Sequence, residues 1–245
     1  MGMAKWESFL GSHIEGFFNR HLSSRLEPIE LSKALQRELI QRRRKDPEGH
    51  VVPNAYTLEL GAEDYEQLSS QRVLDELHVA VERAVIMENC LMDGKLEIQM
   101  VKDGQGKGAL RVRSRFVDKG EASTDRVEPH TIVLERSDFH RPLDLPREYE
   151  IASLTVVSGV DQDSYLAIGE KQIYLGRLGK SDFILTDGNV SRMHAYIAYE
   201  RHRHVLYDAG STNGTFVNGH SITSERLQAG DEIKIGNTTL LYEVL

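Results

Sequence analysis

The stretch YDAGSTNGTFVNG, from Tyr207 to Gly219, sets Asp, Ser, Thr, Asn and three glycines between apolar segments. Glycine adopts positive φ readily, and Asp, Asn and Ser bond to nearby backbone groups, so such runs form tight turns. A simple connection between strands needs only a few of these residues. The surplus of hydroxyl and amide groups therefore predicts a rigid turn that also binds a ligand.

The segments around this turn are short, rich in β-forming residues and separated by further turn signals. Between Ile151 and Leu245, no stretch has helical periodicity, and segments such as IASLTVVSG, KQIYLGR, HAYIAYE and TTLLYEVL follow one another closely. Many short strands at close spacing are typical of a β-sandwich. We expect residues 150–245 to form one all-β domain of this kind.

Three loops of the expected sandwich carry more polar groups than a turn requires. Because a sandwich gathers its loops at two ends, these three loops can share one end. Arginine then presents a planar fork that matches phosphate oxygens, and an asparagine amide can pair with the main chain of an extended peptide. The residues concerned are Gly176 and Arg177, then Ser191, Arg192 and His194, then Ser211, Thr212 and Asn213.

Four pieces of this half, GR, SRMH, STNGTFVNG and LQAGDEIKIG, stand in an order and at a spacing that resemble the forkhead-associated (FHA) domain. The resemblance covers roughly 60 residues. It implies an eleven-stranded β-sandwich that binds phosphothreonine peptides without catalysis.

The same resemblance implies a role for each motif residue. Arg177 and Ser191 fall on the family's phosphate-contacting positions, and Arg192 on a position that often adds a further phosphate contact. Thr212 and Asn213 fall on the peptide-binding turn. The structural positions, where the histidine braces the loops without touching the peptide, fall on Gly176, His194, Gly214, Asn218 and Gly219.

The first half predicts an α+β domain over residues 1–117. Helical spacing recurs from Trp6 to Phe18, after Pro28, and from Asp64 to Met92, while NAYTLELG alternates like a strand. The segment KLEIQMVKDGQGKGALRVRSRFV predicts a hairpin of two strands around a glycine-rich loop. The lone cysteine, Cys90, is expected to be a small buried residue of a helix.

This half resembles the N-terminal domain of the actinobacterial FhaA-type proteins through RLEPIELSKALQREL and VVPNAYTLELGAEDYEQL. The resemblance implies Ser/Thr-kinase signalling linked to cell-wall synthesis and division. The partner it implies is a phosphothreonine-containing protein: a kinase, a pseudokinase or a kinase substrate. The apolar stripe from Trp6 to Phe18 predicts either internal packing or an oligomer contact.

Residues 118–149 lose periodicity and contain three of the six prolines, so we interpret them as a linker. Within it, TIVLE at residues 131–135 is a short strand or a partner-binding segment. Ser123 and Thr124 are candidate kinase sites. Phosphorylated Thr124 could dock into the chain's own phosphothreonine pocket, because the tether raises its effective concentration.

Composition excludes several classes of function. The net charge of -8 argues against a general nucleic-acid binder, and no stretch approaches the length of a membrane span. One cysteine suits a reducing cytoplasm. We expect no enzyme, cofactor or metal site, and RHRH at Arg201–His204 is interpreted as a solvent-exposed strand end.

The alternative is an RNA-associated or membrane-assembly scaffold driven by the N-terminal half and regulated by the FHA domain, with RRRK at Arg42–Lys45 as the RNA contact.

Overall fold

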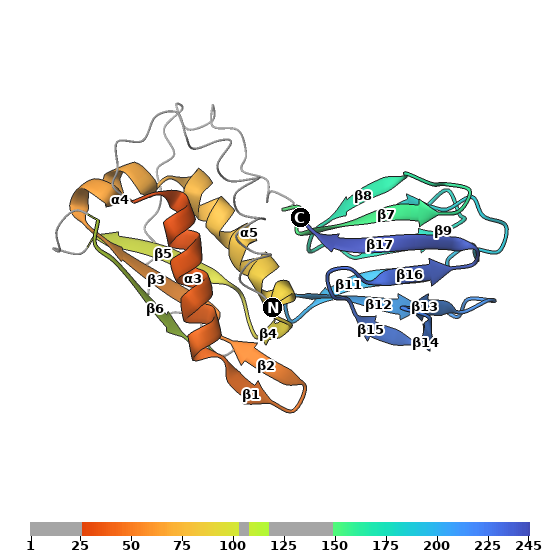
Figure 1. The fold of residues 1–245 in the computed structure, drawn as a ribbon, viewed down its shortest axis with the longest axis horizontal. Helices are drawn as coiled ribbons and strands as arrows, with labels where there is room; N and C mark the ends of the chain where they lie inside the picture. Colours follow the sequence, from red (N-terminus) through yellow and green to blue (C-terminus); the bar gives the residue numbers. More distant parts are fainter. Residues whose placement is uncertain (1–25, 103–107, 118–148) are drawn as a thin grey trace, which may run out of the picture.

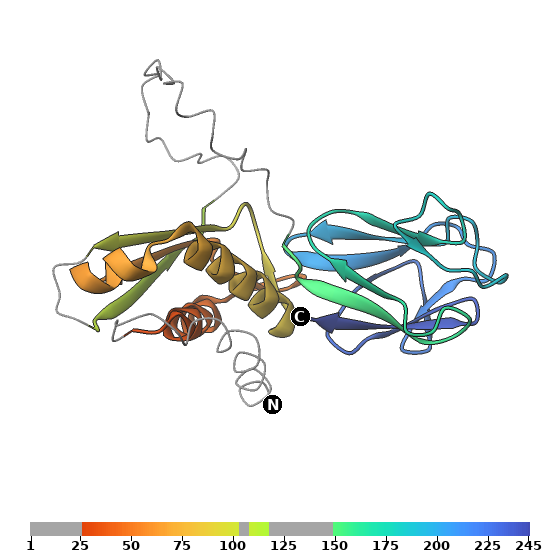
Figure 2. The same cartoon turned by 90° about the horizontal axis from the view of Figure 1, so that it is seen from above.

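The computed structural model describes residues 26–102, 108–117 and 149–245. Two packed units lie side by side along its longest axis, an α+β unit and a β-sandwich (Figures 1 and 2). Each unit has its own cluster of buried apolar side chains. The helical stripe at Trp6–Phe18, the linker segment TIVLE, and Ser123 and Thr124 lie outside the described residues. Within the described ranges, no helix is long and apolar enough to cross a bilayer.

Helix α3, Pro28–Arg42, begins at Pro28, where the sequence predicts helical spacing to start. Proline suits the first turn because its missing N–H would have no helical partner there. The Glu30 carboxylate accepts a hydrogen bond from the Glu27 N–H at 2.9 Å, which caps one of the free amides. The apolar stripe is fully buried against the sheet of this unit, through Leu31, Leu35 and Leu39.

The predicted helix from Asp64 to Met92 is instead two helices and a strand, α4 (Ala62–Leu68), α5 (Gln71–Met87) and β4 (Cys90–Met92). Ser70 caps the start of α5, since its side chain accepts a hydrogen bond from the Val73 N–H. Cys90 is buried as predicted, but it belongs to a strand. The apolar run from 90 to 92 fits either structure, and pairing with β2 (Gly49–Val52) decides it.

The predicted hairpin of residues 95–117 is wrong in its pairing. Strands β5 (Glu97–Lys102) and β6 (Leu110–Arg115) do not pair with each other, because β3 (Ala55–Leu60) lies between them. β3 runs parallel to β5 and antiparallel to β6. Its residues Tyr56, Leu58 and Leu60 are buried in the core that contains the stripe of α3. A second small sheet joins β1 (Arg44–Asp46), β2 and β4.

The C-terminal unit is an eleven-stranded sandwich, as the resemblance implied. One sheet has the order β10-β9-β11-β12-β15 and the other β14-β13-β16-β17-β7-β8. The strands are β7 (Ala152–Ser158), β8 (Tyr165–Ile168), β9 (Ile173–Gly176), β10 (Phe183–Ile184), β11 (Ala195–Glu200), β12 (Arg203–Asp208), β13 (Thr215–Val217), β14 (His220–Ile222), β15 (Ser224–Arg226), β16 (Glu232–Ile235) and β17 (Thr238–Val244).

Candidate phosphopeptide site

The loop after β9 and the loop before β11 run side by side at one end of the sandwich. The Arg177 N–H donates to the Ser191 carbonyl at 3.0 Å, and the Leu178 N–H donates to the Arg192 carbonyl at 3.0 Å. Gly176 makes this approach possible. A Cβ at that position would lie 2.4 Å from the Arg192 carbonyl oxygen, which is closer than real Cβ atoms come to another heavy atom.

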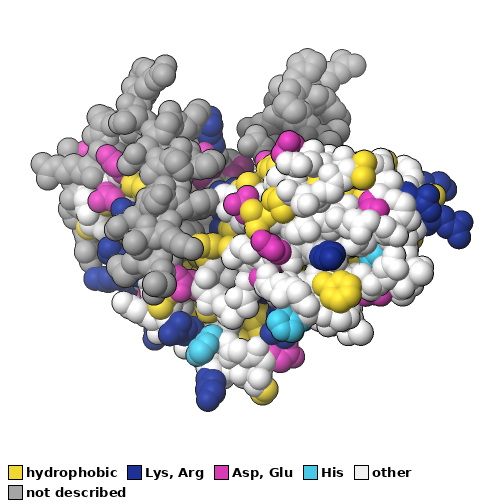
Figure 3. Space-filling model, turned by 45° about the vertical axis from the view of Figure 1, so that its right-hand side comes forward, with side chains coloured by type: hydrophobic (Ala, Val, Ile, Leu, Met, Phe, Trp, Pro, Cys, Tyr) yellow, Lys and Arg dark blue, Asp and Glu magenta, His cyan; other side chains and the backbone are white. Residues whose placement is uncertain are grey.

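Two arginines on these loops are exposed and have no carboxylate partner among the described residues. Arg177 donates from Nε to the Val190 carbonyl at 3.3 Å, which leaves its terminal nitrogens without a bond in the described structure. Arg192 and the neighbouring Lys180 make no ion pair there either. Lys and Arg side chains are visible at the right-hand edge of the space-filling view (Figure 3). Three uncompensated cations on adjacent loops favour an anionic ligand.

His194 joins two of the loops from a fully buried position. Its Nδ1 accepts a hydrogen bond from the Ser191 N–H at 3.0 Å, so the ring proton sits on Nε2, which donates to the Gly214 carbonyl at 3.1 Å. Burial lowers the pKa of His194, although the Gly214 carbonyl and the carboxylates of Asp208 and Asp187 act in the opposite direction. The neutral ring is therefore the form that braces the loops.

Ser191 also contacts the third loop directly. Its Oγ accepts a hydrogen bond from the Thr212 N–H at 3.1 Å, and the two hydroxyl oxygens are 3.5 Å apart. Next along the chain, Asn213 donates from Nδ2 to the Asn189 carbonyl at 2.8 Å, and its side chain is exposed. The hydroxyls of Ser191 and Thr212 and the amide of Asn213 thus lie beside the loop that carries Arg192.

Asp208 organises the recognition turn, residues 208–214, and its role was not predicted from the sequence. Its carboxylate accepts hydrogen bonds from the Ser211 hydroxyl at 2.6 Å, the Thr215 hydroxyl at 2.7 Å, and the N–H groups of Gly210 and Ser211 at 3.0 Å. Burial alone would raise the pKa of Asp208, but these hydrogen bonds outweigh burial and lower it. Asp followed by Gly and Ser is the signal that could have found this turn.

A second aspartate holds the loop before β11 in the same way. Asp187 is buried, and its carboxylate accepts from the N–H groups of Asn189 at 2.9 Å and Asn237 at 2.6 Å. The Asn189 hydrogen bond is the main reason that the pKa of Asp187 is lowered, and the Asn237 bond adds to it. An ionised Asp187 therefore fixes the backbone from which Ser191 and Arg192 project.

The remaining motif residues shape turns. Asn218 and Gly219 form the two-residue turn between β13 and β14, with φ of 49° and 80°. Asn and Gly are the preferred pair for such a turn because both tolerate positive φ. Asn218 also donates from Nδ2 to the Asp231 carboxylate at 2.9 Å. Gly214 has φ of 78°, a conformation that a side chain would strain.

The interpretation of Arg201–His204 as a solvent-exposed strand end is wrong. His204 and Arg203 are each 1% exposed, and His202 is largely buried where the two units meet. The His204 ring bonds to the Tyr242 hydroxyl and to the Gly169 carbonyl, both at 2.8 Å. Among the described residues, no cluster of His, Cys, Asp and Glu could hold a metal ion.

Comparisons with known proteins find a different family model in each half of the chain. The FHA domain model matches residues 173–236, and the model of the FhaA N-terminal domain matches residues 3–113. The glycogen accumulation regulator GarA of Mycobacterium tuberculosis is 31% identical over 140 residues, which cover 51% of this chain and 86% of GarA. The oxoglutarate dehydrogenase inhibitor of Corynebacterium efficiens is 36% identical over 91 residues, covering 37% of this chain and 64% of that protein.

Solved structures of FHA domains are also similar to part of this chain. One is the FhaA FHA domain complexed with the intracellular domain of Rv3910, with 29% identity and a TM-score of 0.35 over 38% of this chain and 99% of that one. Another comes from a study of phosphothreonine-dependent FHA domain interactions, with 28% identity and a TM-score of 0.36 over 39% of this chain and 97% of that one. Together with the sandwich and its loops, the family matches and the GarA relative show that this chain belongs to the FHA-domain proteins, with an FhaA-type N-terminal domain preceding its FHA domain.

Proposed function

We propose that the protein is a non-catalytic adaptor that binds phosphothreonine peptides downstream of Ser/Thr protein kinases. The observation that carries this proposal is the convergence of Arg177, Ser191 and Thr212 from three loops, where neither Arg177 nor Arg192 has a carboxylate partner within the described ranges. A phosphothreonine carries about -1.5 to -2 charges and three strong acceptor oxygens, which match these donors.

Each residue of the site has a distinct proposed role. Arg177 and Ser191 bind the phosphate, and Arg192 adds charge from the neighbouring loop. Thr212 borders the phosphate, while the exposed amide of Asn213 pairs with the peptide main chain. The hydrogen bonds of His194, Asp187 and Asp208 keep these donors in position before the peptide arrives, which lowers the entropy lost on binding.

The size of the expected affinity follows from these contacts. Hydrogen bonds to charged groups contribute roughly 1.5–3 kcal/mol each. Two or three of them, with a few peptide contacts, reach a Kd near 1 μM, which is about -8 kcal/mol. Removal of the phosphate should therefore abolish useful binding. The likeness to FhaA-type proteins supports a cytoplasmic kinase pathway of cell-wall synthesis or division as the setting, and a kinase, pseudokinase or kinase substrate as the partner.

Calorimetric titration of the full chain tests the proposal. A degenerate phosphothreonine peptide library and its unphosphorylated twin are titrated into the wild type, Arg177→Ala and the matched control Arg115→Ala, an exposed arginine of the N-terminal unit. We expect phosphate-dependent micromolar binding that only Arg177→Ala removes. Equal binding of both libraries, or equal loss in the control, would contradict the proposal.

A further inference from the structure

The turn between β11 and β12 contains residues that this kind of turn disfavours. Glu200 pairs with Arg203, so Arg201 and His202 form a two-residue turn, with φ of 47° and 60°. Positive φ at both positions strongly favours Asn-Gly, as in the β13–β14 turn of the same sandwich. Contacts of the Arg201 and His202 side chains must therefore offset this local strain.

Both side chains reach into the N-terminal unit. Arg201 donates from Nε and Nη2 to the two carboxylate oxygens of Asp93 at 2.8 and 3.2 Å, and its Nη1 lies 3.2 Å from the Glu48 carboxylate. The Arg201 carbonyl accepts from the Met92 N–H at 3.1 Å. This fork-to-carboxylate geometry holds the turn against the segment that follows β4.

The imidazole of His202 lies between two acceptors of the N-terminal unit. Nδ1 is 2.8 Å from both carboxylate oxygens of Glu82, and Nε2 is 2.8 Å from the Gly94 carbonyl oxygen. A neutral imidazole has one N–H and can satisfy only one of these contacts. A carboxylate faces one ring nitrogen and a carbonyl faces the other. Both contacts are satisfied only when the Glu82–His202 pair holds one proton more than a neutral histidine beside a carboxylate.

The other groups around this pair act on its proton in both directions. The Tyr199 hydroxyl donates to the Glu82 carboxylate at 2.5 Å, and the Tyr199 ring meets the imidazole edge-on at 6.0 Å. Burial by itself lowers the pKa of His202, but the hydrogen bond and charge of Glu82, the Gly94 carbonyl and the charge of Glu170 raise it above its ordinary value. The nearby positive charge of Arg201 is matched by Asp93 and Glu48.

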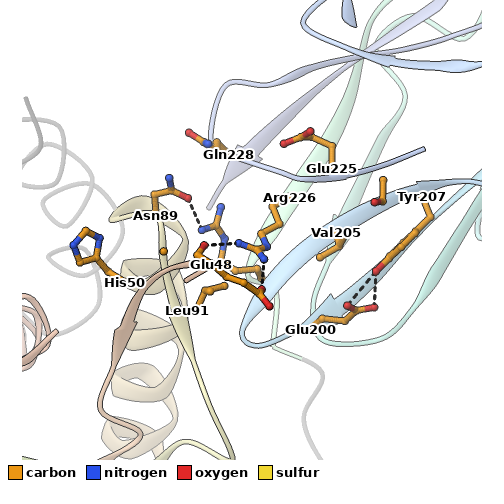
Figure 4. Close-up of a pocket in the computed structure, with 13 residues that line it drawn as sticks. Glu48, His50, Asn89, Leu91, Glu200, Val205, Tyr207, Glu225, Arg226 and Gln228 are labelled. Carbon is orange, nitrogen blue, oxygen red and sulfur yellow. Dashed lines mark hydrogen bonds and ion pairs between the residues drawn. The ribbon is translucent and has the colours of Figure 1, made fainter. Parts of the chain in front are cut away.

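The rest of the junction does not depend on this proton. The buried guanidinium of Arg203 donates to Asn89 Oδ1 at 2.7 Å and to the Cys90 carbonyl at 3.2 Å, and Ile86 of α5 belongs to the apolar cluster of the sandwich. Figure 4 shows Arg226 bonded to Glu48 in a cavity of about 520 Å³ between the units. The cavity leaves part of the junction unpacked.

We propose that the N-terminal unit docks on the FHA domain as one rigid body while the Glu82–His202 pair holds its proton, and that the units separate as the pair loses it. The turn at Arg201–His202 lies at the end of the sandwich opposite the loops of Arg177 and Thr212 (Figure 1). Docking therefore fixes the direction in which those loops point from the N-terminal unit. This inference stands whether or not the loops bind phosphothreonine.

The sign of the pH dependence follows from linkage. A histidine whose pKa is raised on docking stabilises the docked state fully below its ordinary value of about 6.5, and this contribution is lost as pH rises through the docked-state pKa. Each unit by which docking raises that pKa changes the docking equilibrium tenfold between the two limits. Docking should thus weaken toward alkaline pH.

Single-molecule energy transfer on the full chain tests this proposal. Dyes are attached through Gln99→Cys and Lys234→Cys, both exposed positions on different units, while Cys90 stays buried. We expect one narrow distance at pH 6 and a growing second population of longer distance toward pH 9. His202→Gln should show the second population at both pH values. His220→Gln, at an exposed histidine of β14, should behave like the wild type.

A nuclear magnetic resonance titration of the His202 ring is the second measurement. In the wild type we expect its midpoint above 6.5 and coincident with the appearance of the longer distance, and in Glu82→Gln a midpoint lower than in the wild type. One unchanged distance across the pH range would overturn the proposal, and so would a wild-type midpoint at or below 6.5. Because Glu82→Gln leaves the sequence of the turn unchanged, its titration tests the proposal even if His202→Gln fails to fold.

Discussion

Ser191 Oγ accepts the backbone N–H of Thr212 at 3.1 Å across 21 residues of sequence, and this bond ties the recognition turn to the loop that carries Arg192. The same hydroxyl is a proposed phosphate contact. Ser191 therefore has two proposed roles: it binds the phosphate, and it holds the turn that binds the peptide main chain.

Ser191→Ala should consequently weaken phosphopeptide binding more than the loss of one contact. A hydrogen bond to a charged group contributes roughly 1.5–3 kcal/mol, or about 10- to 100-fold in Kd. Loss of the Thr212 acceptor adds to this by freeing the turn. Calorimetry of wild type and variant measures the change, with exposed Ser221→Ala of β14 as the control. A change in Kd of less than threefold would contradict a role for Ser191 in phosphate binding.

Arg192→Ala should reduce affinity less than Arg177→Ala does, because Arg192 makes no bond to the described loops that would fix its guanidinium. We expect a loss of about three- to fivefold, corresponding to an exposed charge contribution of up to about 1 kcal/mol. Arg192→Lys should restore most of it. Titrations at low and high salt provide the check, since the Arg192 contribution should shrink as salt screens it. A salt-independent loss would point to a structural role.

Acid should loosen the phosphopeptide loops through His194. Its pKa is lowered on folding, so its contribution to stability is present above the ordinary value of about 6.5 and is lost as pH falls through the lower folded-state pKa. Protonation puts a second proton on Nδ1, where the Ser191 N–H already donates. In the peptide-free protein, the protection factors of the Ser191 and Gly214 amides, which are their exchange rates relative to the intrinsic rate at each pH, should fall below pH 6. Measuring the free protein avoids protonation of the phosphate itself.

Gly176→Ala should lower both stability and affinity. The new Cβ would meet the Arg192 carbonyl at 2.4 Å and push apart the two loops that carry Arg177 and Ser191. Overpacking of this kind costs about 1–3 kcal/mol in the free energy of unfolding. Gly179→Ala, in the loop that follows β9, is the matched control, because a Cβ there meets nothing within 4 Å. Thermal unfolding compares the two, and equal effects would contradict the close approach of the loops.

Local chemistry made much of the FHA half predictable from the sequence. The turn at Asn218–Gly219 follows from residue preferences that the structure shares, and in the N-terminal half the start of helix α3 at Pro28 does so too. Pairing of distant segments was not predictable in this way. β5 and β6 looked like a hairpin because they are neighbours in sequence, whereas β3 pairs with both of them from an earlier part of the chain.

The junction of the two units could not be predicted from the sequence, for a related reason. Arg201–His204 alternates charge like an exposed strand end, and its burial comes from Glu82, Asn89 and Asp93, which lie more than a hundred residues earlier. Asp208 and Asp187 were also missed, since an aspartate in a turn has the same local pattern whether or not it fixes a binding loop. Only the folded arrangement separates these cases.

The most direct test of the central claim is the calorimetric titration of phosphorylated and unphosphorylated peptide libraries into the wild type and Arg177→Ala. The account predicts a Kd near 1 μM for the phosphothreonine library with the wild type, no measurable binding of its unphosphorylated twin, and loss of binding in Arg177→Ala. Binding that survives the loss of either the phosphate or the guanidinium would contradict it.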